Sequence, residues 1–234
     1  MNKKKTKIIA LIPAKKNSKE LKNKNLKKLN DLSLVELTIQ NLKSKLIDKI
    51  YLSSDSDKIL KSGTKLNINA IKRKKNLSTY STSANLVILD FIKNKIENTN
   101  QDYIIIYLQP TSPFRNNTHI DLALKHFIKK RLRFVVSVTE NKNFFKSLYK
   151  KNVYLNPFFN DNFITNNRQN LEKIYSPNGA IYIFYSSDFI KIKKLSFKKS
   201  GYYIMNKIDS IDIDGKEDYE LAKNLSKKYL KTKN

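Results

Sequence analysis

The chain has 234 residues and a formal net charge of +27, from 47 lysines and arginines against 20 aspartates and glutamates. This length fits one globular domain with a substantial core. The absence of cysteine excludes disulfides and thiolate chemistry, and no apolar stretch approaches the roughly 20 residues that cross a bilayer. The basic start, MNKKKTK, precedes only a short apolar run without signal-peptide character, so we expect a cytoplasmic location.

The positive charge admits two interpretations. It could mark a nucleic acid or an acidic membrane as the partner, or it could be a solvated lysine surface. The lysines are scattered among abundant asparagine and isoleucine rather than gathered in one tail. We therefore expect a solvated surface that helps to attract anionic substrates, and neither a nucleic-acid partner nor a membrane partner.

Segments with strand and helix periodicity alternate over the first 140 residues. The segment 33–46 places apolar side chains at helical spacing after Ser33, with Glu36 as its capping-box partner. The segment 102–108, DYIIIYL, is apolar on both faces, as a central parallel strand covered by helices should be. The alternation predicts a Rossmann-like α/β fold with a mainly parallel sheet. The predicted strands are 7–14, 48–54, a short piece around 68–73, 102–108 and 133–140, and the predicted helices are 33–46, 56–62, 83–97 and 119–130.

The periodicity stops between residues 141 and 175, where aromatic and asparagine-rich pieces such as NPFFNDNFITNN replace it. We interpret this stretch as a lobe inserted into a single domain that spans residues 1–234. Beyond the lobe, strands are predicted at 179–185, 202–205 and 210–214, and a closing helix at about 216–230.

The loop after the first strand is the first candidate site, because ligands of open parallel sheets bind beyond the carboxyl ends of the strands. Ammonium groups and backbone N–H donors can bind phosphates, although this loop has no glycine and is not a Walker loop. On chemistry alone, a phosphate site and a solvated loop both remain open. The loop contains Lys15, Lys16, Lys19, Lys22 and Lys24 around Asn17, Ser18 and Asn25.

Two later segments could contact a sugar or a carboxylate. Gln109 ends the central strand, and the prolines of PTSPFR after it would hold its amide and Arg115 in fixed positions. An amide can donate to and accept from a sugar hydroxyl, but the glutamine could also simply end a strand. In RQNLEKIYSPNGAIY, Arg168 could grip a carboxylate in a bidentate fork, and Gly179 allows close approach of the backbone.

Carboxylates are better candidate metal ligands than histidines. In SIDID, the two-residue period of a strand places Asp212 and Asp214 on one face, where Mg²⁺ could bind both together with substrate phosphates. Alternatively, Asp214 and Glu217 form a capping box for the last helix and Asp212 is an exposed strand residue. His119 and His126, seven residues apart on one predicted helix, are interpreted as surface or packing residues.

Eight segments, in order, carry a resemblance to a known family: IPAKKNSKELKNKNL, SLVELTIQ, LSTYSTSA, LQPTSPFR, VVSVTE, RQNL, PNGAIYI and IMNKIDSIDIDGKEDYELA. Together they resemble, essentially end to end, the CMP-sialic acid synthetases, the N-acylneuraminate cytidylyltransferase family, which includes the enzymes for legionaminic and pseudaminic acids. LQPTSPFR, PNGAIYI and SIDID, in this order and spacing, are the most specific of the eight.

This resemblance implies a Rossmann-like nucleotidyltransferase fold in which the 141–175 lobe reaches into a partner subunit, and hence a homodimer. It also implies an activity. The anomeric hydroxyl of a nine-carbon acidic sugar would attack the α-phosphate of CTP, with pyrophosphate leaving and Mg²⁺ offsetting charge on the phosphate oxygens. Positioning and electrostatics would supply most of the rate.

The resemblance also assigns site residues. The expected CTP-binding residues are Lys15, Asn17, Ser18, Lys24, Asn25, Arg73 and Ser83. The expected sugar-binding residues are Gln109, Lys146, Arg168 and Gln169. The expected metal ligands are Asp212 and Asp214, which form the expected catalytic set together with Lys15 and Lys24.

Four positions depart from the family pattern. Lys15 replaces an arginine and loses its planar fork, and Glu20 replaces a glycine and brings a negative charge near the triphosphate. Tyr80 stands at a common aspartate position, and Ser176 stands where many relatives carry an arginine. Two alternatives therefore remain: a degenerate, non-catalytic nucleotide-binding protein, and a cytidylyltransferase for a shorter acid sugar such as Kdo.

Overall fold

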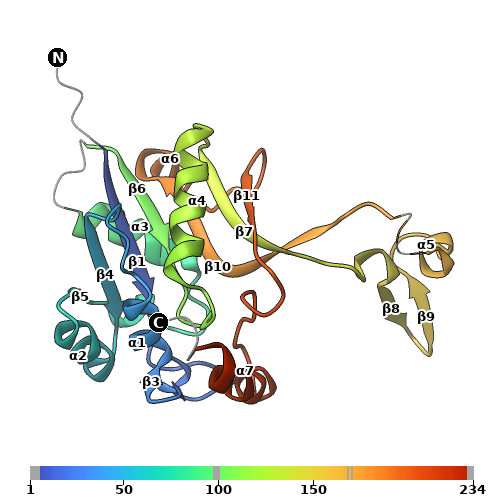
Figure 1. Cartoon of the computed structure of the whole chain (residues 1–234), viewed down its shortest axis with the longest axis horizontal. Helices are drawn as coiled ribbons and strands as arrows, with labels where there is room; N and C mark the ends of the chain where they lie inside the picture. The colour runs from blue at the N-terminus through green and yellow to red at the C-terminus, as the bar shows by residue number, and fades with distance from the viewer. Residues whose placement is uncertain (1–5, 97–100, 168, 170, 231–234) are drawn as a thin grey trace.

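A seven-stranded sheet organises the computed structural model, which describes residues 6–96, 101–167, 169 and 171–230 (Figure 1). The spatial order is β11-β7-β10-β6-β1-β4-β5. β6, β1, β4 and β5 are mutually parallel, β10 is antiparallel to both of its neighbours, and β11 is parallel to β7. The predicted mainly parallel α/β sheet is confirmed. The strands are β1 (Lys7–Pro13), β4 (Lys49–Ser54), β5 (Asn69–Lys72), β6 (Tyr103–Tyr107), β7 (Phe134–Glu140), β10 (Tyr175–Tyr185) and β11 (Gly201–Ile204).

Helices cover both faces of the sheet, and the alternation of side chains along each strand serves the two layers. In β1, Ile8, Ala10 and Ile12 pack with α1 (Leu34–Gln40), α2 (Asp57–Lys65) and α4 (Asn117–Lys129). Ile9 and Leu11 point to the opposite face, toward α3 (Ala84–Lys95) and α6 (Ser186–Ile192). The continuous apolar run of the first strand therefore reflects burial on both faces.

A short two-stranded hairpin and the last helix complete the body of the domain. The hairpin of β2 (Lys28–Leu29) and β3 (Leu32–Ser33) leads into α1, and α7 (Lys216–Tyr229) packs near it through a third apolar cluster. That cluster joins Leu21 of the first loop, Phe114 and Ala222. Within the described residues, no helix combines the length and apolarity that crossing a membrane requires.

The predicted capping box of α1 is confirmed, but the helix ends earlier than predicted. Glu36 N donates to Ser33 Oγ at 3.3 Å, and Ser33 N donates to Glu36 Oε2 at 2.8 Å. The helix ends at Gln40 instead of residue 46, because Asn41 donates its side-chain amide to Arg115 O and Ser44 Oγ accepts from Leu46 N. Such local side-chain bonds compete with helix propagation.

The structure corrects two expectations for the segment before α7. Residues 210–214 were expected to be a strand, but they form a turn and an extended loop that crosses the end of the sheet. Ile213 N donates to Thr111 O at 2.9 Å, and the Ile213 side chain is buried in the third apolar cluster. The capping box of Asp214 and Glu217, the alternative to metal binding, does not form either, because Asp218 Oδ2 accepts from the backbone N–H of Asp214 and of Gly215.

A lobe projects from one edge of the body (Figure 1). β7 and β10 carry it, since they remain paired as far as Glu140 and Tyr175. It contains a 3₁₀ turn (Phe144–Lys146), the hairpin of β8 (Leu148–Lys151) and β9 (Tyr154–Pro157), and α5 (Asp161–Thr165). Phenylalanine rings with centroids 4.9 to 5.8 Å apart fill its centre, namely Phe144, Phe145, Phe158, Phe159 and Phe163.

Arg115 is a fully buried cation that ties together three elements at one end of the sheet. Its Nη1 donates to Gln109 O at 2.8 Å and to Ala180 O at 2.9 Å, and its Nη2 donates to Thr38 Oγ1 at 3.2 Å. Burial lowers the pKa of Arg115 to about 9, an effect that the charge of Asp212 opposes. The guanidinium therefore stays mostly charged at neutral pH.

We expect Arg115→Ala to lower the free energy of unfolding by about 3 kcal/mol or more, because it leaves buried carbonyl groups without donors and opens a cavity. Arg133→Ala is the matched control, since Arg133 is an exposed arginine paired with Asp188 and should cost about 1 kcal/mol or less. Urea unfolding of both variants measures the difference. Equal costs would refute the structural role of Arg115.

Candidate active site

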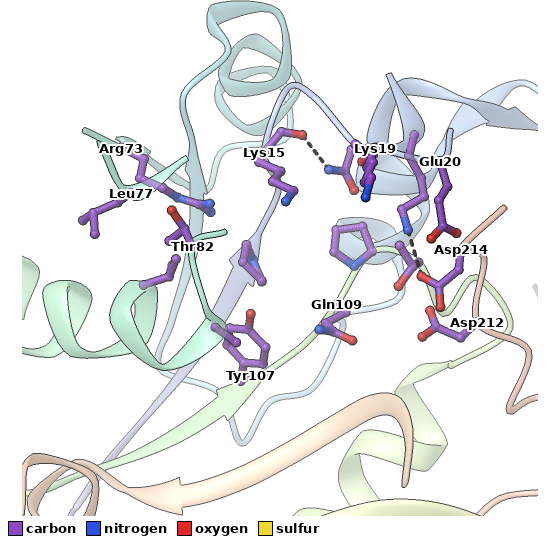
Figure 2. A pocket seen from close by; sticks show the side chains of 18 residues that line it. Lys15, Lys19, Glu20, Arg73, Leu77, Thr82, Tyr107, Gln109, Asp212 and Asp214 are labelled. Carbon is purple, nitrogen blue, oxygen red and sulfur yellow. Dashed lines mark hydrogen bonds and ion pairs between the residues drawn. The ribbon is translucent and has the colours of Figure 1, made fainter. Parts of the chain in front are cut away.

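A cavity of about 550 Å³ opens at the carboxyl ends of the parallel strands (Figure 2). It lies where the chain order reverses, since β1 has β4 on one side and β6 on the other. Crevices at such switch points are the usual ligand sites of open α/β sheets. The cavity is lined by Pro13, Lys15, Ser18, Lys19, Glu20, Lys24, Asn25, Arg73, Leu77, Thr82, Ala84, Val87, Tyr107, Gln109, Pro110, Thr111, Asp212 and Asp214.

The loop after β1 supplies the cationic wall. Its shape is held without glycine, because the buried side chain of Asn25 donates to Lys15 O at 2.8 Å, and Lys16 N donates to Asp55 Oδ1 at 2.8 Å. Lys15 and Lys24 therefore reach the cavity from a braced loop. The Lys15 ammonium lies 5.7 Å from the centre of the Tyr80 ring, which places a cation–π contact at one of the positions that depart from the family pattern.

Asp212 and Asp214 supply the acidic wall, although no strand pleat aligns them. Asp214 Oδ1 accepts from Lys24 Nζ at 3.0 Å. Burial raises the pKa of Asp212, and the negative charge of Asp214 adds to this, while a hydrogen bond with Thr111 and the charge of Lys24 oppose it. The buried Asp212 Oδ1 has no hydrogen-bond partner in the described part of the chain. A desolvated carboxylate oxygen of this kind is costly unless a cation or donor joins it.

Gly179 allows the side chains of Gln109 and Asp212 to approach the backbone of β10 closely. Its φ is +76°, and a Cβ there would lie 2.9 Å from Asp212 Oδ2 and 2.9 Å from Gln109 Oε1. Any other residue would combine backbone strain with a clash against both polar groups. The close approach predicted for this glycine is confirmed. A bulge between Pro177 and Tyr182, where the pairing with β7 shifts register, produces the required backbone shape.

The opposite side of the cavity is less charged and more apolar. Figure 2 shows Arg73, Leu77 and Thr82 there, with Lys15 and Gln109 between them and the aspartates. Arg73 is buried and donates through Nη2 to Ser53 O at 2.7 Å, and burial lowers its pKa. Burial also raises the pKa of the Tyr107 phenol well above its usual range. This side of the cavity therefore offers both apolar surface and hydrogen-bonding groups, which suits a ligand with a planar ring attached to a polar group.

The cavity brings together most, but not all, of the residues that the sequence nominated. Lys15, Ser18, Lys24, Asn25, Arg73, Gln109, Asp212 and Asp214 line it. Asn17 is exposed on the same loop, and Ser83 caps α3 by accepting from Leu86 N at 3.4 Å. Lys146 and Gln169 lie in the lobe, and Arg168 lies outside the described residues. The proposed sugar contacts of these last three residues stay predictions.

Several lining residues were missed by the sequence analysis. Thr111 follows Gln109 within the PTSPFR loop, and Leu77 and Thr82 belong to the LSTYSTSA segment. Their place after strand ends could have nominated them. Of the two histidines, His119 accepts from Asn116 N at the start of α4 and lies 3.3 Å from Asp209, which agrees with the packing role predicted for it. Neither histidine lines the cavity.

Comparisons with known proteins identify the family of the chain. A family model described as cytidylyltransferase matches residues 9–233. An N-acylneuraminate cytidylyltransferase of Escherichia coli O18:K1:H7 is 34% identical over 226 residues, which cover 95% of this chain and 53% of that protein. The chain thus spans about half the length of this relative. A pseudaminic acid cytidylyltransferase of Campylobacter jejuni is 28% identical over 94% of this chain and 97% of its own length.

A solved structure shares the fold. The structure of CMP:2-keto-3-deoxy-manno-octonic acid synthetase complexed with CTP superimposes with a TM-score of 0.70 at 13% sequence identity, over 94% of this chain and 98% of that chain. At this identity the likeness concerns the fold alone. The family model shows the family as well as the fold. It matches nearly the whole sequence, including the loop after β1, the loop after β6 and the segment of the two aspartates. The chain belongs to the cytidylyltransferase family.

Proposed function

We propose that the chain transfers CMP from CTP to the anomeric hydroxyl of a nonulosonic acid, a nine-carbon acidic sugar of the sialic type, with release of pyrophosphate. One observation carries the proposal: a single cavity places the lysines of the first loop, the Gln109 amide and the Asp212–Asp214 pair around one space. The named relatives, an N-acylneuraminate and a pseudaminic acid cytidylyltransferase, support the substrate class.

The charges of the cavity suit CTP in one orientation. Its base and ribose fit beside Arg73, Leu77 and Thr82, and its phosphates then fall toward Lys15 and Lys24. Lys24 and Asp214 neutralise each other in the ligand-free protein, so both charges are already placed when the triphosphate arrives. Preorganised charges of this kind stabilise a phosphoryl transition state without reorganisation during the reaction.

The acidic wall fits Mg²⁺. This ion takes one or two carboxylates together with phosphate oxygens and water, and Asp212 offers a buried oxygen without a hydrogen-bond partner in the described chain. The described residues contain no group of three or more histidine, aspartate, glutamate or cysteine side chains that could hold a metal ion, so the remaining ligands would come from substrate and water. Bound there, Mg²⁺ would offset the charge that grows on the phosphate oxygens.

The protein's part in the reaction is mainly to position the two substrates. Gln109 would orient the sugar through its amide while the anomeric oxygen forms a bond to the α-phosphorus and the bond to the β-phosphate breaks. The hydroxyl proton would pass to the carboxylate site or to water. Holding the oxygen and the phosphorus in line accounts for much of the rate in such reactions.

We further propose a cytoplasmic homodimer. CTP is a cytoplasmic metabolite, and the cysteine-free sequence needs no oxidising compartment. The lobe exposes apolar side chains, of which Val153 is 85% and Tyr154 is 71% exposed, and such patches are typical of protein interfaces. Lys146 and Gln169 lie in the lobe, so a lobe that reaches a partner subunit would bring them toward the partner's cavity.

Pyrophosphate release tests the function. The protein is incubated with CTP, Mg²⁺ and, separately, N-acetylneuraminic, legionaminic, pseudaminic and Kdo acids, with a control that contains no sugar. We expect release with a nine-carbon acid and a product of CMP–sugar mass. Silence with every acid, from protein that binds CTP, would instead favour a non-catalytic nucleotide-binding protein, an alternative supported by the negative charge of Glu20 in the cavity.

Removing either carboxylate should abolish most of the activity. We expect Asp212→Asn and Asp214→Asn to lower kcat on the order of a hundredfold, because each variant weakens the proposed Mg²⁺ site that would offset the negative charge growing on the phosphate oxygens. Asp57→Asn, an exposed aspartate paired with Lys72, is the matched control and should keep normal turnover. The melting temperature gives an independent readout, because Mg²⁺ should raise it further when CTP is present. If Mg²⁺ still gave this extra rise in Asp212→Asn, the metal assignment would be contradicted.

Asp212→Asn should also stabilise the ligand-free protein at neutral pH. Burial raises the pKa of Asp212 in the folded state, so the folded protein binds this proton more tightly than the unfolded chain. Wild-type stability then falls as the pH rises through the raised pKa, and the asparagine variant avoids that loss. The difference in the free energy of unfolding between Asp212→Asn and the wild type should shrink as the pH falls toward about 4. In Asp57→Asn the sign should be opposite, because Lys72 lowers the pKa of Asp57.

A further inference from the structure

Two basic segments meet at the end of the sheet that lies opposite the active-site cavity. Residues 129–133 precede β7 and residues 191–199 precede β11, and these strands run parallel with their starts side by side, Gly201 opposite Val135. The rings of Phe134 and Phe197 pack edge to face at 5.5 Å between the segments. In Figure 1, α4 and α6, which lie on opposite faces of the sheet, both reach the top of the body.

This end of the molecule carries a concentrated positive charge. The two segments contribute nine exposed basic side chains, which are Lys129, Lys130, Arg131, Arg133, Lys191, Lys193, Lys194, Lys198 and Lys199. Two acidic residues lie nearby, namely Asp188, which pairs with Arg133, and Asp102, which acts on Arg133 electrostatically and accepts hydrogen bonds from Ser186 and Ser187, so nine positive charges face two negative ones. The summed field at this surface is therefore strongly attractive to anions.

The same surface has an apolar component. A second cavity, of about 250 Å³, opens among the lysines. Its apolar lining is Phe134, Phe184, Phe189, Ile192 and Leu195, and its charged lining is Arg133, Asp188, Lys194, Lys198 and Lys199. Beside it, Ile192 and Phe197 are each 49% exposed and Ile128 is 46% exposed. Lysines that alternate with exposed apolar side chains are typical of surfaces that lie on a bilayer.

We propose that this end of the molecule, which we call the basic face, docks on an anionic membrane surface. The lysines would lie among the lipid head groups while Ile192 and Phe197 enter the interface between head groups and acyl chains. The charge pattern favours lipid over nucleic acid, because seven of the nine cations are lysines and the guanidinium of Arg133 is held by Asp188 and the Tyr185 ring. An apolar cavity among cations also has no role on a phosphate backbone.

This docking would leave the active site accessible. The basic face lies at the starts of β7 and β11, and these strands run in the same direction as β6, whose carboxyl end borders the active-site cavity. A molecule that rests on the basic face therefore turns this cavity toward the water. The proposal differs from the expectation, based on the scattered lysines of the sequence, that the positive charge is a solvated surface without a membrane partner, and the experiment below decides between them.

Vesicle sedimentation of the full chain tests the proposal, with phosphatidylglycerol mixed into phosphatidylcholine and with phosphatidylcholine alone, at near-physiological salt. The test variant carries Lys194→Gln, Lys198→Gln and Lys199→Gln. The matched control carries Lys58→Gln, Lys61→Gln and Lys65→Gln on α2, which lies beside β4 and β5 toward the other edge of the sheet. Both variants lose the same charge, so a difference between them reports position and not net charge. Thermal unfolding checks that both are folded.

We expect the wild type to sediment with anionic vesicles and not with neutral ones. The test variant should bind on the order of a hundredfold more weakly, since each lysine near a membrane contributes about 1 kcal/mol, and the α2 control should bind almost as the wild type does. Salt screens the lysines but not the apolar contact. Relative to the wild type, Ile192→Asn should therefore lose a larger fraction of its vesicle binding at high salt than at low salt.

Three results would overturn the proposal. The first is failure of the wild type to bind anionic vesicles. The second is equal loss of binding in both triple variants, which would mean that net charge alone is responsible. The third is tight binding of a single-stranded RNA oligonucleotide that the test variant loses, without any binding of vesicles, which would assign the basic face to nucleic acid instead.

Discussion

The active site depends on one buried guanidinium. Arg115 donates to carbonyls at the end of β6 and in the bulge of β10 and also to a hydroxyl of α1. These contacts hold the end of β6 and the bulge of β10 together, and both Gln109 and Asp212 approach Gly179 in that bulge. A cation without a carboxylate partner in hydrogen-bond contact is unusual inside a protein, and here carbonyl oxygens and the nearby charge of Asp212 stabilise it.

The charges in the cavity lower the stability of the folded protein, but they suit the proposed reaction. A desolvated carboxylate, a lysine–aspartate pair and several further lysines share one space. Proteins often accept such local destabilisation where function needs preorganised charge. Glu20 belongs to this balance, since its carboxylate lines the same cavity and moderates the cationic wall. Without glycine, the loop is held instead by the side chains of Asn25 and Asp55.

The sequence predicted much of the fold because its buried strands are short apolar runs with clear boundaries. The residues 7–14 and 102–108 were recognised for this reason, and so was the cap at Ser33. The segment 210–214 misled, because alternation of apolar and acidic residues also arises in an extended loop that buries Ile213 between a half-buried Asp212 and an exposed Asp214. α6 escaped notice because its seven residues are too few for helical periodicity to show.

The site was predictable to the extent that it follows strand ends. Lys15, Gln109 and Arg73 each come after a strand, and parallel strands bring their carboxyl ends together. Contacts that depend on tertiary packing could not be seen in the sequence. The clamp by Arg115 and the partnerless oxygen of Asp212 belong to this second class, because each requires several elements distant in sequence.

The lobe has a consequence for how such proteins can diverge. It is built around its own cluster of phenylalanines and is carried on β7 and β10, well away from the loops that line the cavity. Its surface can therefore accumulate substitutions without disturbing the groups that handle the nucleotide. With the lobe as the proposed dimer interface, two paralogues in one cell could acquire incompatible lobe surfaces and remain separate dimers while they keep the same cavity.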